Sequence, residues 1–172
     1  GHNPTSESHT EAIRAKIIQD VVNGGAFVFS RSSAPDIRGL RVSPLGVVEG
    51  KKLRVGHDLT FAGGGDRSSV NDDTDFSAPP PCELGHIFGD VCRQILCLCQ
   101  RHGAVTRFMV CRIDVKDAFP QIPVDPSQAA TFGYVFGEYT VVDLVVEFGW
   151  RSSFGYWDLV ASSLEHAHNQ MR

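Results

Sequence analysis

The chain has no run of apolar residues near the ~20 that a membrane-spanning helix needs, and no apolar stretch near residue 1 resembles an intact secretory signal. A leader removed earlier would leave no trace, so a secretory route stays open. An excess of positive charge is also missing, because 16 Lys and Arg stand against 20 Asp and Glu, for a formal net charge of -4. Since phosphate binding rests largely on Lys and Arg, this balance argues against a strong general affinity for nucleic acid and leaves room only for a local basic patch.

Cysteine is scarce, with five positions that follow no regular spacing. The odd count argues against a disulfide scaffold. Cys92, Cys97 and Cys99 fall in a predicted helix, where zinc-knuckle geometry is not expected. We therefore predict buried free thiols in a reducing compartment, the cytoplasm or the nucleus.

What is present fits a globular protein of one domain, or one domain with an appendage, since 42% of the 172 residues are hydrophobic and 21% are charged. Apolar spacing predicts helices over residues 13–22, 84–101 and 154–168, the last with Tyr156, Trp157, Val160 and Leu164 facing inward. Strands are predicted at 26–29, 52–59 and 108–113, an edge strand or bend at 42–48, and a hairpin over 130–148 with a turn at Gly137-Glu138. Residues 61–81 form a long irregular connection between the predicted strand 52–59 and the predicted helix 84–101. The order predicts an α+β fold with an antiparallel sheet and packed helices.

The segment with the clearest chemical character is 114–119, Asp114-Val115-Lys116-Asp117-Ala118-Phe119, at the end of the predicted strand 108–113. A buried unpaired carboxylate is costly, so an acid at the end of an apolar strand makes sense at the rim of a cation site. Mg²⁺ favours one or two carboxylates together with water and substrate phosphates. A structural alternative stays open, in which Asp114 caps a turn and Asp117 pairs with Lys116 or a neighbour.

Further segments stand in the order found in the reverse transcriptases of retrotransposons. Segment 114–119 resembles motif A of that family, and 51–59 upstream resembles its fingers hairpin. Ser69-Val70-Asn71 is similar to the element that follows the hairpin, and 148–153 downstream resembles motif B, a glycine-containing turn into a helix. From about Leu40 onward the chain therefore resembles the fingers and part of the palm of an RNA-directed DNA polymerase, a partial right-hand fold.

The resemblance implies roles for individual residues. Asp114 would be the catalytic carboxylate and a ligand of Mg²⁺, and Phe119 would lie below the sugar and exclude a 2′-hydroxyl. Arg54, with its planar fork of donors, suits a phosphate or a base. The implied nucleotide-binding residues are Lys51, Lys52, Arg54, Asp117, Ala118, Phe119, Gly149 and Arg151. Local alternatives remain: a solvated strand face for Lys52 and Arg54, a core aromatic for Phe119 and a simple turn for Gly149.

The chain also departs from the family. The Asp-Asp pair of motif C, which would complete the two-metal site, does not follow the motif B segment, and no thumb follows it. Pro120 and the bulky Phe154 stand where the family has other residues, and Gly56 weakens the fingers strand. We therefore expect a degenerate copy that has no polymerase activity as an isolated chain.

The resemblance divides the chain into an N-terminal tail and helix (1–25), a fingers-like part (26–83), a palm-like part (84–117), a fingers hairpin (118–149) and a palm-like motif B helix (150–172). Two functions stay open. A reverse-transcriptase-like fragment would bind a primer-template and a deoxynucleoside triphosphate (dNTP) with Mg²⁺. A recruited, non-catalytic relative of retroelement origin would instead bind a protein partner. Neither reading involves a membrane.

Overall fold

The computed structural model describes residues 9–48, 50, 54–63, 67–78, 87–103, 107 and 114–170. The helices are α2 (Thr10–Val22), α3 (Ile87–His102) and α4 (Ser153–Gln170), and the strands are β1 (Ala26–Ser30), β2 (Leu45–Val48), β3 (Arg54–His57), β4 (Gly133–Phe136) and β5 (Tyr139–Asp143). Short 3-10 turns are η1 (Arg31–Asp36), η3 (Phe119–Gln121) and η4 (Ala129–Thr131). Mixed helices and small antiparallel sheets confirm the predicted α+β class.

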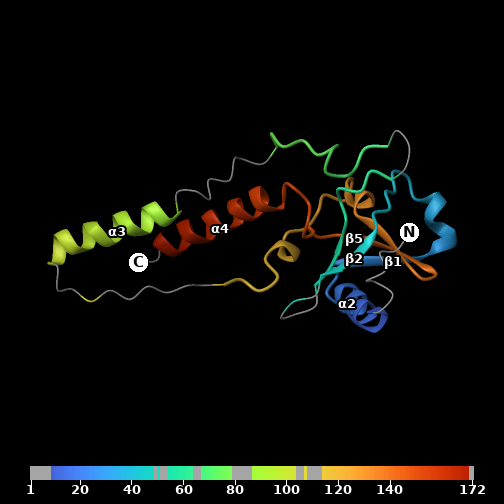
Figure 1. The fold of residues 1–172 in the computed structure, drawn as a ribbon, viewed down its shortest axis with the longest axis horizontal. Coiled ribbons are helices and arrows are strands. Elements are labelled where there is room, and N and C mark those ends of the chain that lie inside the picture. Colours follow the sequence, from blue (N-terminus) through green and yellow to red (C-terminus); the bar gives the residue numbers. More distant parts are fainter. Residues whose placement is uncertain are drawn as a thin grey trace.

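The larger sheet has the order β1-β5-β4 and is antiparallel throughout (Figure 1). The predicted hairpin 130–148 is confirmed as β4 and β5, and Gly137 in its turn has a φ of 58°, which glycine adopts without strain. β1 pairs with β5 from Ala26 opposite Asp143 to Ser30 opposite Tyr139. Residues 26–30 and the hairpin 133–143, which are far apart in the sequence, therefore share one sheet.

The second sheet consists of β2 and β3, with Leu45 opposite His57. α2 packs its buried Ile13 and Ile17 into a core formed with side chains of both sheets: Ala26, Leu45, Val47, Tyr134 and Val141. A smaller core consists of Leu59, Val70 and Phe132, the last of which directly precedes β4. The predicted helix 13–22 is confirmed, and it ends at Asn23 before Gly24, whose φ is 74°.

α3 and α4 extend away from the body that carries the sheets (Figure 1). Both predicted helices are confirmed, but the expected inward position of Leu164 is wrong, because its side chain is 58% exposed. Leu164 belongs to neither of the core clusters that the described residues form. The thiols of α3 are free as predicted, yet the expectation that they are buried is wrong, since Cys97 is exposed and Cys92 and Cys99 are half-buried.

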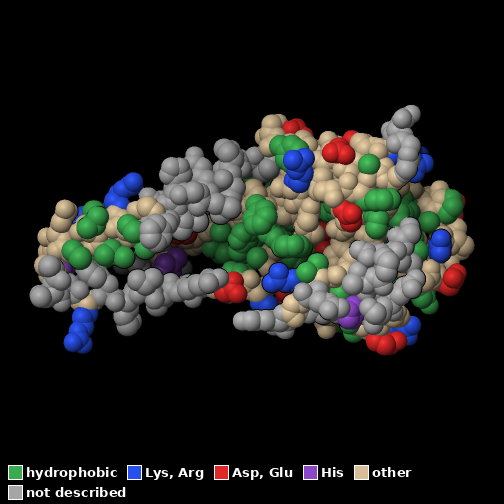
Figure 2. Space-filling view, in the orientation of Figure 1, with side chains coloured by type: hydrophobic (Ala, Val, Ile, Leu, Met, Phe, Trp, Pro, Cys, Tyr) green, Lys and Arg blue, Asp and Glu red, His purple; other side chains and the backbone are tan. Residues whose placement is uncertain are grey.

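Some predictions fall outside the described residues, namely the strand 108–113 and the Lys52 end of the strand 52–59. None of the described helices combines the length and the apolar character needed to cross a bilayer. Hydrophobic side chains gather on one face where α4 leaves the sheet-bearing body (Figure 2). Phe148 and Phe154, at this junction, are 58% and 53% exposed.

Candidate functional site

The turn at 148–151, immediately before α4, brings together segments that are distant in sequence. Gly149 has a φ of 100°, a conformation that side chains with a Cβ rarely adopt. A Cβ there would also lie 3.4 Å from the carbonyl oxygen of His57, at the end of β3. The backbone conformation therefore requires glycine at this position, and the turn lies beside the end of β3.

Asn71 holds this turn from the other side. Its side chain is almost wholly buried, at 1% exposure, and makes two hydrogen bonds to backbone groups. Nδ2 donates to the Gly149 carbonyl at 3.0 Å, and Oδ1 accepts from the Arg151 amide at 2.9 Å. The indole of Trp150 donates to Thr74 Oγ1 at 2.9 Å, so the loop 69–74 and the turn are joined at several points.

The loop that supplies Asn71 is itself fixed by a reciprocal pair of hydrogen bonds. The Ser69 amide donates to Asp72 Oδ2 at 3.0 Å, and the Asp72 amide donates to Ser69 Oγ at 3.0 Å. Hydrogen bonding by the Ser69 hydroxyl and by the Ser69 amide lowers the pKa of the Asp72 carboxyl, because its ionised form is the better acceptor. Asn71 is therefore presented by an ordered loop.

Phe119 completes the junction. Its ring centroid lies 6.1 Å from that of Phe148 and 5.2 Å from that of Phe154, the latter in an edge-to-face arrangement. Such aromatic pairs contribute beyond their buried area. The structure thus brings the end of β3, the Asn71 loop, the Phe119 segment and the 148–151 turn to one place.

Other predicted residues lie at the surface. Asp114, Asp117 and Arg54 are exposed, and no ion pair joins Arg54 to Asp114 in the described part of the chain. The carboxylate of Asp117 lies 3.9 Å from the amino group of Lys116, which matches the structural alternative. Asp117 also has a φ of 50°, a region that aspartate enters more readily than most residues.

The remaining predicted positions have less specific surroundings. The guanidinium of Arg151 stacks 4.6 Å from the ring centroid of Phe76, and Ala118 is half-buried. Lys51 and Lys52 lie outside the described residues. Asp114 is not among the described groups of three side chains that could hold a metal ion, so the structure adds no second ligand to the predicted Mg²⁺ position.

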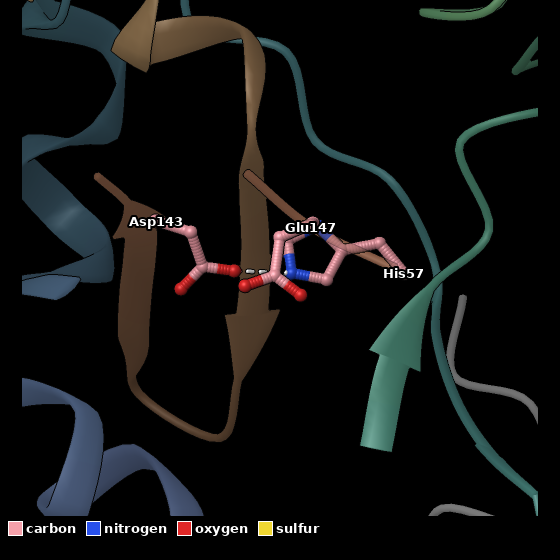
Figure 3. A group of neighbouring side chains, drawn as sticks. All are labelled: His57, Asp143 and Glu147. Atoms are coloured by element: carbon pink, nitrogen blue, oxygen red, sulfur yellow. Dashed lines mark ion pairs between the residues drawn. The ribbon is translucent and has the colours of Figure 1, made fainter. Parts of the chain in front are cut away.

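A buried polar cluster that the sequence did not single out lies next to the turn (Figure 3). It consists of His57 at the end of β3, Asp143 at the end of β5, and Glu147 just before the turn. Nε2 of His57 lies 2.6 Å from Asp143 Oδ2, and the two side chains are 2% and 4% exposed. One donor atom from each of the three residues lies within 4.8 Å of the others.

The electrostatics of this cluster follow from burial. Burial raises the pKa of Glu147 well above its ordinary value, and the neighbouring Asp143 carboxylate raises it further. Burial also raises the pKa of the Tyr134 hydroxyl. The ring of Tyr134 packs edge-on against His57 with 4.5 Å between centroids. Glu147 is therefore expected to retain its proton where an exposed glutamate would have lost it.

Lys16 and Asp20, a hydrogen-bonded pair on α2, act on the same cluster. Their side chains meet at 2.6 Å. Burial alone would lower the pKa of Lys16, but the hydrogen bond to Asp20 and the negative charge of Glu147 give a net increase. Burial raises the pKa of Asp20, and Lys16 opposes that increase.

One signal in the sequence could have indicated the cluster. Asp143 and Glu147 interrupt the otherwise apolar stretch 141–148, and charged groups in such a stretch need partners. The position of His57 opposite them depends on tertiary packing. Comparison of the chain with protein-family models and with curated protein sequences finds no match.

Proposed function

We propose that the chain is a reverse-transcriptase-like domain of retroelement origin. We also propose that the junction around the 148–151 turn forms part of its nucleotide-binding site. The observation that carries the proposal is the convergence of separately recognised segments. Asn71 bonds to the Gly149 carbonyl and the Arg151 amide, Phe119 packs on Phe148, and the β3 backbone lies against the turn. Contacts among four segments that stand in this family's motif order support the proposal.

In this proposal the exposed side chains supply the contacts to the ligand. Arg54 offers a planar set of donors to a phosphate, and Asp114 offers a carboxylate to a Mg²⁺ ion that accompanies the triphosphate. The ion would supply charge neutralisation at the phosphates. One exposed carboxylate fits an ion that takes most of its ligands from water and phosphate oxygens, but the described residues add no second protein ligand.

The test is a titration of the purified chain with dNTP in the presence of Mg²⁺ or Mn²⁺. Arg54→Ala and Asp114→Asn are expected to weaken binding, while Arg38→Ala, at an exposed arginine outside the junction, is the matched control. Binding that is strongly salt-dependent and lost in both site variants supports the proposal. No binding by the unaltered chain, or equal loss in the control, contradicts it.

A second function, protein interaction by a non-catalytic relative, is favoured by the exposed apolar side chains of α3 and α4. Leu96 and Leu164 are 62% and 58% exposed. Leu159, Val160, Ser163 and Leu164 form an open, mostly apolar surface along one face of α4. Apolar surface of this kind marks sites of association.

The two functions respond to different substitutions. Leu164→Glu is expected to abolish association through α4 and to leave dNTP binding unchanged. Asp114→Asn is expected to do the reverse. Sedimentation velocity measures association and dNTP titration measures nucleotide binding, and both are applied to both variants. A large loss of partner affinity in Asp114→Asn would count against the interaction function.

A further inference from the structure

We propose that His57, Asp143 and Glu147 form a binding site for a divalent transition-metal ion, with Zn²⁺ as the ion that best matches the donors. The site is distinct from the predicted Mg²⁺ position at Asp114 and does not depend on the polymerase ancestry. Its members come from β3, the end of β5 and the segment before the 148–151 turn, so an ion here would join three parts of the fold.

The donor set selects the kind of ion. One imidazole nitrogen and two carboxylate oxygens suit borderline ions such as Zn²⁺, whereas Mg²⁺ and Ca²⁺ prefer oxygen donors alone. Zinc sites with three protein ligands leave a fourth position for water. Nε2 of His57 faces Asp143 Oδ2, whereas Nδ1 is buried without a hydrogen-bond partner among the described residues, so an ion ligated at Nε2 would be shared with the neighbouring carboxylate.

The geometry is close to what ligation requires. Around a tetrahedral ion with ligand bonds of about 2.0–2.1 Å, donor atoms lie about 3.4 Å apart. The three donor atoms here lie within 4.8 Å of one another, and the closest pair, His57 Nε2 and Asp143 Oδ2, is 2.6 Å apart. Displacements of about 1 Å would admit the ion, a distance within the reach of side-chain rotation.

Charge favours the same conclusion. With a neutral imidazole and ionised carboxyl groups, Lys16 contributes one positive charge, and Asp20, Asp143 and Glu147 contribute three negative charges. The net excess of two negative charges in a buried region is costly unless it is compensated. A single dication would compensate this excess in full.

The test is calorimetric titration of Zn²⁺ into the full chain after removal of metal with a chelator. Zn²⁺ can also bind other groups, including the α3 thiols, but these are present in every variant. The proposed site is therefore identified by the difference in Zn²⁺ binding between the unaltered chain and each site variant. Glu147→Gln and His57→Gln are expected to remove one equivalent of binding or to weaken it at least about 100-fold, since even loss of a residue that supports a ligand costs 10–100-fold. Asp125→Asn, at an exposed turn, is the control.

Glu147→Gln is expected to fold, because the amide can donate to Asp143 as the protonated carboxyl does; circular dichroism checks this for each variant. Co²⁺ provides a second readout. A visible spectrum of nitrogen and oxygen ligation that disappears in Glu147→Gln supports the site. A spectrum dominated by thiolate charge transfer and equal in every variant overturns it, as does a chain that binds no Zn²⁺ or binds it equally well in all variants.

Discussion

Replacement of Asn71 by alanine tests how the 148–151 turn is held. The substitution removes the donor to the Gly149 carbonyl and the acceptor for the Arg151 amide, at 3.0 and 2.9 Å. It leaves the loop's own bonds between Ser69 and Asp72 in place. The change therefore isolates the connection between the loop and the turn.

The magnitude follows from the number and setting of these bonds. Each is worth about 0.5–1.5 kcal/mol net, so losing both costs about 1–3 kcal/mol. Asn71 itself is 1% exposed, whereas Gly149 and Arg151 are exposed, so water can reach the freed backbone groups and the cost stays within that range. For a chain of this length 1 kcal/mol corresponds to about 2–4 °C, and Tm is expected to fall by about 4–8 °C for a loss of 2 kcal/mol.

Thermal and urea unfolding measure this change, with Asn23→Ala as control. Asn23 is exposed and takes part in a side-chain bond from Gln19, so its replacement is expected to change the free energy of unfolding by no more than about 0.5 kcal/mol. An Asn71→Ala chain as stable as the control would refute the account of the turn given above.

Asn71→Asp refines the same test. The introduced carboxylate keeps the acceptor for Arg151 but turns an oxygen toward the Gly149 carbonyl. Its protonated form can donate to that carbonyl, so the folded state favours the proton and raises the carboxyl pKa. Stability is then present at low pH and is lost as pH rises through the folded pKa. A variant whose deficit does not grow with pH contradicts this reasoning.

Three further outcomes are expected. Gly133→Ala should cost about 1–3 kcal/mol in chemical denaturation, because the Cβ would lie 2.6 Å from the Arg41 carbonyl oxygen, while Gly89→Ala, on an open helix face, should be neutral or stabilising by up to about 1 kcal/mol. Because the pKa of Glu147 is raised, the folded state holds a proton that the unfolded state releases. Stability therefore falls as pH rises from the ordinary glutamate range through the folded pKa. Glu147→Gln should flatten that part of a curve of Tm against pH. Primer-extension assays with Mg²⁺ or Mn²⁺ should show no templated incorporation by the isolated chain, and incorporation would contradict the expectation that a second carboxylate set is required.

Local elements could be predicted because their signals are local. Alternating apolar residues around Gly137 predicted the β4–β5 hairpin, and spacing of Ile13 and Ile17 predicted α2. The position of Leu164 could not be predicted in the same way. Helical spacing predicts which side chains share a face, whereas burial depends on whether another element covers that face. α4 extends beyond the sheets, and Leu164 is exposed.

At the candidate site too, some residues carried a local signal in the sequence and others depended on tertiary packing. Gly149 was predicted in a glycine-containing turn that leads into a helix, and the structure has Gly149 at a φ of 100° just before α4. His57 carried no local signal, because its role depends on β3 reaching Asp143 and Glu147 on a segment more than eighty residues later. Asp143 and Glu147 did carry a signal, since acids within an apolar stretch require compensation.

The turn at 148–151 is held between two polar anchors with different chemistry. Asn71 binds it through neutral hydrogen bonds that do not change with pH, whereas Glu147, at its start, belongs to a buried charged cluster that responds to protons and, by our proposal, to metal. Because both anchors act on the same short segment, their effects should not be additive. Stability of the double variant Asn71→Ala, Glu147→Gln, compared with the two single variants, measures that coupling. A coupling near zero would mean that the cluster and the Asn71 loop hold the turn independently, and that metal or proton uptake at the cluster is not transmitted to the junction that we propose binds a nucleotide.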